Sequence, residues 1–115
     1  MMSLCSEEKA LEIVRDPSVL PYLRFYPESI ADVEKYLIGK ESLLVVIPVK
    51  DEAEVHIASK YRDRAVIRKS LIDGIAWLRG RGFSRITTTA PEERTALINL
   101  LKSLGFNYDG ERWVL

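Results

Sequence analysis

The segment from residue 53 to residue 89 constrains the fold more than any other part of the chain. Its middle part predicts a helix over about 62–79, with apolar residues on one face and glycines Gly80 and Gly82 at its end: Ile67, Leu71, Ile75 and Leu78. Strands are predicted on either side, at 53–59 and 84–89. A strand, helix and strand of this length form a right-handed crossover that makes the two strands parallel. The segment therefore predicts an α/β fold.

A second strand precedes this crossover unit. The apolar run 43–47 is rich in β-branched residues, and the polar stretch 50–52 separates it from strand 53–59, which predicts a β-hairpin. A hairpin joined to a crossover gives a mixed, α+β type of sheet. Within 53–59 the period of two places Val55 and Ile57 on the core face. The opposite face carries Glu54, His56 and Ala58.

The N-terminal forty residues predict helices and no strand. Ser6 caps a helix that stops at Asp16-Pro17, and Ser29 caps a second helix over about 29–38 that closes at Gly39. No strand is expected before Ser6. The proline-broken stretch 17–27 carries aromatic residues and is expected to pack on the domain and to wall a groove.

The C-terminal part predicts one more helix and a short strand. Thr89 and Glu92 form a capping box for an amphipathic helix that ends at Gly105. A turn at 107–110 then leads into a last strand over 112–115.

Length and composition limit the function classes. With 115 residues and 47% hydrophobic content, the chain is expected to form a single domain over 1–115. Its 17 basic and 17 acidic residues cancel, which argues against nucleic acid or an anionic membrane as the main partner. Cys5 is the only cysteine, so no disulfide framework or thiolate metal cluster is expected, and no metal site is predicted. With no signal peptide or apolar run near ~20 residues, we predict a cytoplasmic protein.

One stretch carries a local excess of positive charge. Residues 60–69 hold five cationic side chains and one anionic side chain at the predicted start of the long helix. A helix N-terminus already carries partial positive charge, so cations there are unfavourable unless an anion lies among them. A bound phosphate, held by backbone N–H groups and arginines, would remove the conflict. A solvated basic face is the alternative interpretation.

The order of these elements resembles the core of the GNAT N-acetyltransferases over residues 54–106, about half of the chain. That family has a strand, an Arg/Gln-x-x-Gly-x-Gly/Ala loop, a helix, a strand and a helix closing on Leu-Gly-Phe. The matching segments here are Val55 to Ser59, Tyr61 to Ile67, the helix to Leu78, Gly82 to Ile86, and Leu97 to Phe106.

The chain is also similar to short GNAT-like proteins encoded by bacteriophages. The matching motifs are Glu54-Val55-His56, Ala76-Trp77-Leu78 and Pro91-Glu92-Glu93-Arg94. If this similarity holds, the protein would act in the cytoplasm of the phage's host.

The resemblance implies acetyl-CoA as the co-substrate. The pyrophosphate loop would consist of Arg62, Asp63, Arg64, Ala65, Val66 and Ile67. Ile57 and Ala58 would pair with the pantetheine arm through their main chain, and Arg94 would lie near the outer half of the cofactor. Ala65 and Ile67 stand where the family has glycines, and Leu101 stands where it often has a tyrosine acid.

Three side chains are candidates for proton transfer. Glu54 and His56 project to one face of the predicted strand two residues apart, so either is expected to act as a base, directly or through water. Tyr108 would replace the missing tyrosine as the acid. A structural, hydrogen-bonded histidine is the alternative for His56, and Trp77 and Trp113 are expected in the core or at an edge of the sheet rather than as stacking platforms for bases.

The function hypothesis follows from the resemblance together with the basic segment. It is an acyl-CoA-binding N-acetyltransferase that transfers an acetyl group to a primary amine. The alternative is a catalytically inactive GNAT-fold interaction or assembly protein with a homodimeric or other protein partner.

Overall fold

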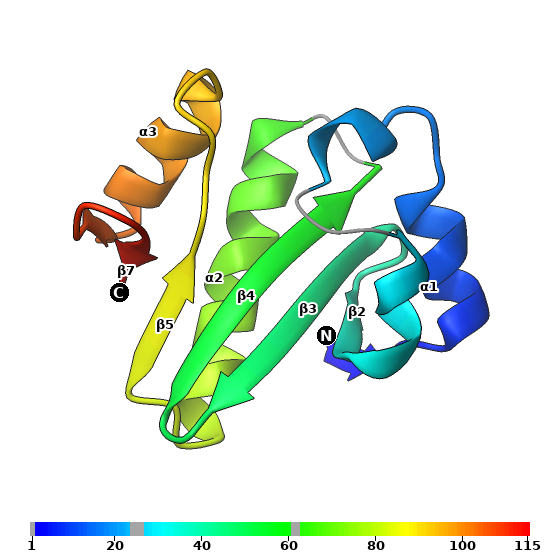
Figure 1. The fold of residues 1–115 in the computed structure, drawn as a ribbon, viewed down its shortest axis with the longest axis horizontal. Helices are drawn as coiled ribbons and strands as arrows, with labels where there is room; N and C mark the ends of the chain where they lie inside the picture. Colours follow the sequence, from blue (N-terminus) through cyan, green and yellow to red (C-terminus); the bar gives the residue numbers. More distant parts are fainter. Residues whose placement is uncertain (1, 24–26, 61–62) are drawn as a thin grey trace.

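The computed structural model describes residues 2–23, 27–60 and 63–115, and over these residues it forms a seven-stranded mixed sheet with the order β1-β2-β3-β4-β5-β7-β6 (Figure 1). The strands are β1 (Met2–Leu4), β2 (Glu34–Ile38), β3 (Ser42–Val49), β4 (Glu52–Ser59), β5 (Arg85–Thr88), β6 (Asn107–Tyr108) and β7 (Trp113–Val114). The helices are α1 (Glu7–Val14), α2 (Arg64–Gly80) and α3 (Thr95–Ser103), with 3₁₀ turns at Leu20–Tyr22 and Pro27–Asp32.

Helices lie on both faces of the sheet. α2 and α3 pack on one face through Leu78 and Leu101, which join a cluster with Leu44, Val46 and Val55 of the central strands. α1 packs on the other face through buried residues that contact the opposite sides of β3 and β4: Ala10, Ile13, Val14, Leu43, Val45 and Ala58. Because α1 covers only the part of this second face formed by β3 and the Ala58 end of β4, β5 is left without a helix on this face (Figure 1).

The predicted crossover and hairpin are confirmed. β3 and β4 pair antiparallel from Ser42↔Ser59 to Val49↔Glu52, and β4 pairs parallel with β5 after the passage through α2. The predicted α1 is confirmed as well, and the Ser6 side chain accepts a hydrogen bond from the Lys9 N–H at 3.1 Å.

α2 and α3 end in the same way, at a Gly-Phe pair. Gly105 has a φ of +97°, its N–H donates to the Lys102 carbonyl, and the Phe106 N–H donates to the Leu101 carbonyl. Gly82 and Phe83 repeat this pattern at the end of α2. The left-handed glycine satisfies the last carbonyls of the helix and directs the phenylalanine into the core.

The predicted helix over 29–38 is wrong. A 3₁₀ turn ends at Asp32, and Glu34–Ile38 is strand β2 between β1 and β3. Tyr36 and Ile38 are buried two residues apart, which is the period of a strand, and two neighbouring strands satisfy the backbone of this segment. Ile30, Val33 and Leu37 fall at helical spacing, which favoured the helix, but Leu37 lies in β2 and the spacing corresponds to no α-helix.

Two further predictions at element ends are corrected. A strand does precede Ser6, since β1 pairs antiparallel with β2 through Ser3↔Leu37. The capping box at Thr89–Glu92 does not form, because α3 begins at Thr95 after a turn at 92–93, and its N-cap residue is Arg94. The last strand is shorter than predicted, and pairs with β5 and β6.

Candidate active site

β4 and β5 pair over a short distance and then separate. Their register runs through Glu52↔Arg85, Ala53↔Ile86 and Glu54↔Thr87. At the next residue the Thr88 hydroxyl donates to the Val55 carbonyl at 2.8 Å. β4 continues to Ser59 while β5 ends at Thr88, and Figure 1 shows the two strands diverging beyond this point.

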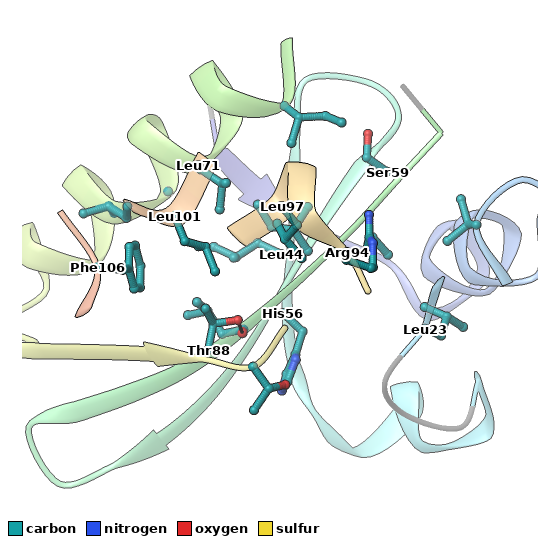
Figure 2. A pocket seen from close by; sticks show the side chains of 18 of the residues that line it. Leu23, Leu44, His56, Ser59, Leu71, Thr88, Arg94, Leu97, Leu101 and Phe106 are labelled. Atoms are coloured by element: carbon teal, nitrogen blue, oxygen red, sulfur yellow. Dashed lines mark hydrogen bonds between the residues drawn. The ribbon is translucent and has the colours of Figure 1, made fainter. Parts of the chain in front are cut away.

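A cavity of about 110 Å³ lies where the strands have separated. Residues 55–59 of β4 line one side, and α2 and α3 contribute apolar side chains that include Ile67, Leu71, Leu97 and Leu101. Figure 2 shows Ser59 and Arg94 toward one end of the cavity and Phe106 toward the other. Val19 and Leu23 of the 17–27 segment also line it, whereas the aromatic residues Phe25 and Tyr26, expected to line a groove, lie outside the described part of the chain.

The backbone of β4 offers polar groups to this cavity. The Val55 carbonyl faces β5, since it accepts the Thr88 bond, and the alternation of a strand turns the N–H and C=O of Ile57 to the same side. Ala58 is 4% exposed, and its side chain packs in the cluster beneath α1. Ile57 thus contributes main-chain donors and acceptors to the cavity, and Ala58 contributes to its wall.

Glu54 and His56 form a hydrogen-bonded pair beside the cavity. The His56 Nε2 and Glu54 Oε2 atoms are 3.0 Å apart, and the side chains are 14% and 34% exposed, respectively. Both lie on the face of β4 opposite Val55 and Ile57, as the strand alternation predicts. His56 also lines the cavity, so a hydrogen-bonded carboxylate and imidazole lie at its edge.

The start of α2 carries its own anionic cap. Asp63 is the N-cap residue, and its Oδ1 accepts a hydrogen bond from the Ala65 N–H at 2.8 Å. The Ile67 N–H donates to the Asp63 carbonyl at 3.1 Å, so Asp63 lies one turn before Ile67, which lines the cavity. One of the first-turn amides predicted to meet a phosphate is therefore occupied by the protein's own carboxylate.

The architecture matches solved structures over nearly its whole length. The Escherichia coli ribosomal-protein-S18-alanine N-acetyltransferase aligns with a TM-score of 0.75 at 21% identity, covering 99% of this chain and 88% of that one. A Bacillus subtilis acetyltransferase solved in complex with CoA aligns at 0.74 and 15% identity, covering 99% and 96%. A Streptococcus pneumoniae acetyltransferase of the GNAT family aligns at 0.71 and 11% identity, covering 99% and 95%.

The chain has the GNAT fold. The predicted fold class is thereby confirmed. No protein-family model matches the sequence, and no curated protein matches it either, so the likeness is one of structure.

The cationic side chains of residues 60–69 lie in different surroundings in the folded protein. Lys60 lies against α1 and the β2–β3 turn, with its Nζ 3.1 Å from Glu12 and 3.2 Å from Glu41. Lys69 pairs with Asp73 at 2.9 Å. Arg64 and Arg68 are exposed, and Arg62 lies outside the described residues together with Tyr61. Because Lys60 and Lys69 pair with carboxylates, the excess of positive charge at the start of α2 is smaller than the sequence predicts.

Two other predicted site residues lie in different places relative to the cavity. Arg94 lines it and precedes α3. Tyr108 is on β6 at the far edge of the sheet, beyond β5 and β7, where its hydroxyl donates to the Gly110 carbonyl at 3.0 Å. This tyrosine is 57% exposed, and its ring contacts Trp113, so the fold does not bring it to the Glu54–His56 pair.

Three hydroxyl-bearing residues of the cavity are not among the predicted site residues. Ser59, Thr88 and Thr89 line it, and Thr88 also marks the separation of the strands. The signal was the Thr-Thr-Thr run at 87–89, which is polar where a buried strand would continue with apolar residues.

Two classes of site find no support in the described ranges. Within residues 2–23, 27–60 and 63–115, no three His, Cys, Asp or Glu side chains are grouped to hold a metal ion. Over the same residues, no helix combines the length and the apolar character required to cross a bilayer.

Proposed function

We propose that this protein transfers an acetyl group from a thioester donor, acetyl-CoA, to a primary amine. The observation that carries the proposal is the separation of β4 and β5 after Val55, with a cavity beside the freed main chain of β4. The likeness to acetyltransferases, one of them solved with CoA, supports the same conclusion.

The chain's own groups fit the arm of such a donor. The donor supplies an acyl carbon activated by its bond to sulfur. The Ile57 N–H and C=O face the cavity and would hydrogen-bond the amide groups of a pantetheine arm, or the N–H would donate to the thioester carbonyl and polarise it. The apolar side chains of α2 and α3, such as Leu71 and Leu97, would cover the arm and exclude water.

Glu54 and His56 would remove the proton from the attacking amine. A primary amine is largely protonated at neutral pH and becomes a nucleophile only after this step. The 3.0 Å bond between the two side chains orients the imidazole and lets the carboxylate stabilise it when it is charged. Arg94, at the end of the cavity near Ser59, would contact the outer part of the donor.

Isothermal titration and a thiol-release assay test the proposal together. We expect acetyl-CoA to bind with measurable heat, and free thiol to appear only when a reactive primary amine is added. The absence of heat at millimolar acetyl-CoA, with no thiol released for any amine of a broad panel, would retire the proposal.

A second candidate is a GNAT-fold interaction protein without catalysis. It is favoured by the Asp63 cap on the Ala65 N–H, by the loss of both loop glycines at Ala65 and Ile67, and by the remote position of Tyr108. A stable homodimer or complex with another protein in size-exclusion chromatography, without turnover, would support it. The phage origin and the cytoplasmic location stay predictions under either function.

A further inference from the structure

We infer that the donor is recognised through its thioester-bearing arm and not through a nucleotide diphosphate. The inference rests on the proposed function and deepens it: the pantetheine-type thioester arm is the part of the donor that the protein recognises, and a nucleotide diphosphate attached to that arm adds little to binding. Three features of the cavity and of its mouth carry it.

The first feature is the charge at the start of α2. The N-terminal amides of a helix are the natural place for a phosphate. Here the Asp63 carboxylate takes the Ala65 N–H at 2.8 Å, directly before Ile67 at the cavity. A diphosphate at this place would have to displace or approach a carboxylate, and like charges repel.

The second feature is the direction of the nearby cations. Lys60, next to the cavity residue Ser59, is held by Glu12 and Glu41 on the α1 side. Lys69 is held by Asp73 along the outside of α2. Ala65 and Ile67 place side chains on the first turn where the family has glycines near the cofactor. Arg64 and Arg68 stay exposed on α2, so within residues 63–69 the Asp63 cap and the Ile67 side chain, rather than a lack of cations, disfavour a diphosphate at the helix start.

The third feature is the cavity between β4 and β5, which has the shape and lining that a thioester arm would need. β4 and β5 separate after Val55, and the cavity between them is lined by apolar side chains and by the main chain of β4. Because the arm and the diphosphate contact different parts of the protein, the first can be retained without the second. Most of the binding energy would then come from the arm, with a smaller contribution from Arg94 at the outer part of the donor.

Such an arm has two sources: a free small thioester, or an arm carried on another protein. Both present the same chemistry to the cavity, and the experiment separates them. The ligands are acetyl-CoA, acetyl-pantetheine, and an acetylated carrier protein, each titrated calorimetrically into the full chain. A preference for the carrier protein over acetyl-pantetheine assigns the arm to a protein, and equal binding assigns it to a free thioester.

The variant that tests the inference is Asp63→Asn. Asparagine caps helices as well as aspartate does, so the fold is kept while the charge is removed. The matched control is Glu8→Gln, which removes an exposed carboxylate from the first turn of another helix, α1, on the opposite face of the sheet from α2. Asp63→Ser, with another capping side chain, serves if the asparagine variant folds poorly.

In the unmodified chain we expect acetyl-CoA and acetyl-pantetheine to bind within about threefold of each other, because the diphosphate adds little. Asp63→Asn should increase the affinity for acetyl-CoA about fivefold at low ionic strength, and by less in 0.5 M salt. The affinity for acetyl-pantetheine should not change. Glu8→Gln should leave both affinities unchanged.

Binding of acetyl-CoA more than about tenfold tighter than acetyl-pantetheine by the unmodified chain would overturn the inference and leave the proposed function intact. An Asp63→Asn variant with unchanged or weaker acetyl-CoA affinity would also overturn it. If neither thioester binds at millimolar concentration, the proposed function fails and the inference fails with it.

Discussion

The Thr88 hydroxyl donates a hydrogen bond to the Val55 carbonyl at 2.8 Å, at the point where β4 and β5 stop pairing. A side chain here takes the place of the next ladder bond between the strands. This side-chain hydrogen bond satisfies the Val55 carbonyl, while the chain after β5 turns away from β4 toward α3. The bond therefore marks the inner end of the cavity and links local hydrogen bonding to the space available for a ligand.

Thr88→Val tests the contribution of this bond. Valine keeps the shape and the strand preference of threonine but leaves the Val55 carbonyl without its donor, so we expect a loss of about 1 kcal/mol in the free energy of unfolding. Urea denaturation at neutral pH measures it.

Thr87→Val is the matched control. Thr87 is fully buried, and its hydroxyl has no hydrogen-bond partner among the described residues. Replacing that hydroxyl with a methyl group should leave stability unchanged or raise it by up to about 1 kcal/mol. A larger loss for Thr87→Val than for Thr88→Val would contradict the interpretation of both hydroxyls.

Glu54→Gln tests the proton-accepting pair. Glutamine retains a hydrogen-bonding partner for His56 but cannot hold the charge, so kcat should fall about 100-fold while the affinity for the donor changes by less than about twofold. Thiol release under saturating donor measures kcat, and calorimetry measures the affinity. Glu52→Gln, on the same strand and paired with Arg85 and Arg112 instead, is the control that should keep its turnover. Full activity in Glu54→Gln would remove this carboxylate from the mechanism.

Lys60→Met tests the charge network that joins α1 to the end of β4. The pKa of Glu12 lies below its ordinary value because its carboxylate accepts hydrogen bonds, first from Lys60 and then from Lys9. A carboxyl whose pKa is lower in the folded than in the unfolded state stabilises the fold above the unfolded value, and this contribution is lost as the pH falls through the folded value. We expect the melting temperature of the unmodified protein to decline below about pH 4.5.

In Lys60→Met the melting temperature at pH 7 should be lower, and its decline toward pH 3 shallower. Thermal unfolding from pH 7 to pH 3 measures both, and Lys40→Met, at the exposed β2–β3 turn, should follow the unmodified protein. Parallel pH curves for Lys60→Met and the unmodified protein would show that the network contributes nothing to acid sensitivity.

Gly74→Ala tests the packing of α2 beside the cavity. A Cβ at Gly74 would lie 3.5 Å from the Leu44 side chain and 3.6 Å from the Ile38 side chain, which is ordinary contact. Since alanine favours a helix interior over glycine, we expect stabilisation by about 0.5–1 kcal/mol in urea denaturation. Gly105→Ala should instead destabilise by about 1 kcal/mol, because φ at Gly105 is +97°. Destabilisation by Gly74→Ala would mean that the helix cannot tolerate the added methyl group.

The sequence was sufficient for the elements whose signals are local. The crossover from β4 through α2 to β5 was predictable because Ile67, Leu71 and Leu78 recur at helical spacing between two strand-like runs. The alternation that separates Val55 from Glu54 and His56 follows from the geometry of a strand alone. The helix ends at Gly82 and Gly105 were predictable because a left-handed glycine closes a helix through bonds within a few residues.

Features that depend on segments far apart in the chain were decided only by the tertiary structure. β1 and β2 exist because they pair with each other and with β3, and three to five residues carry too little local signal to compete with a helical pattern. Lys60 follows directly on the β4 residue Ser59, yet its ammonium group pairs with Glu12 and Glu41, because folding brings α1 and the β2–β3 turn alongside it. Tyr108 was assigned to the site by its chemistry, but β7 separates its strand from β5, so distance in the sheet excludes it from the cavity.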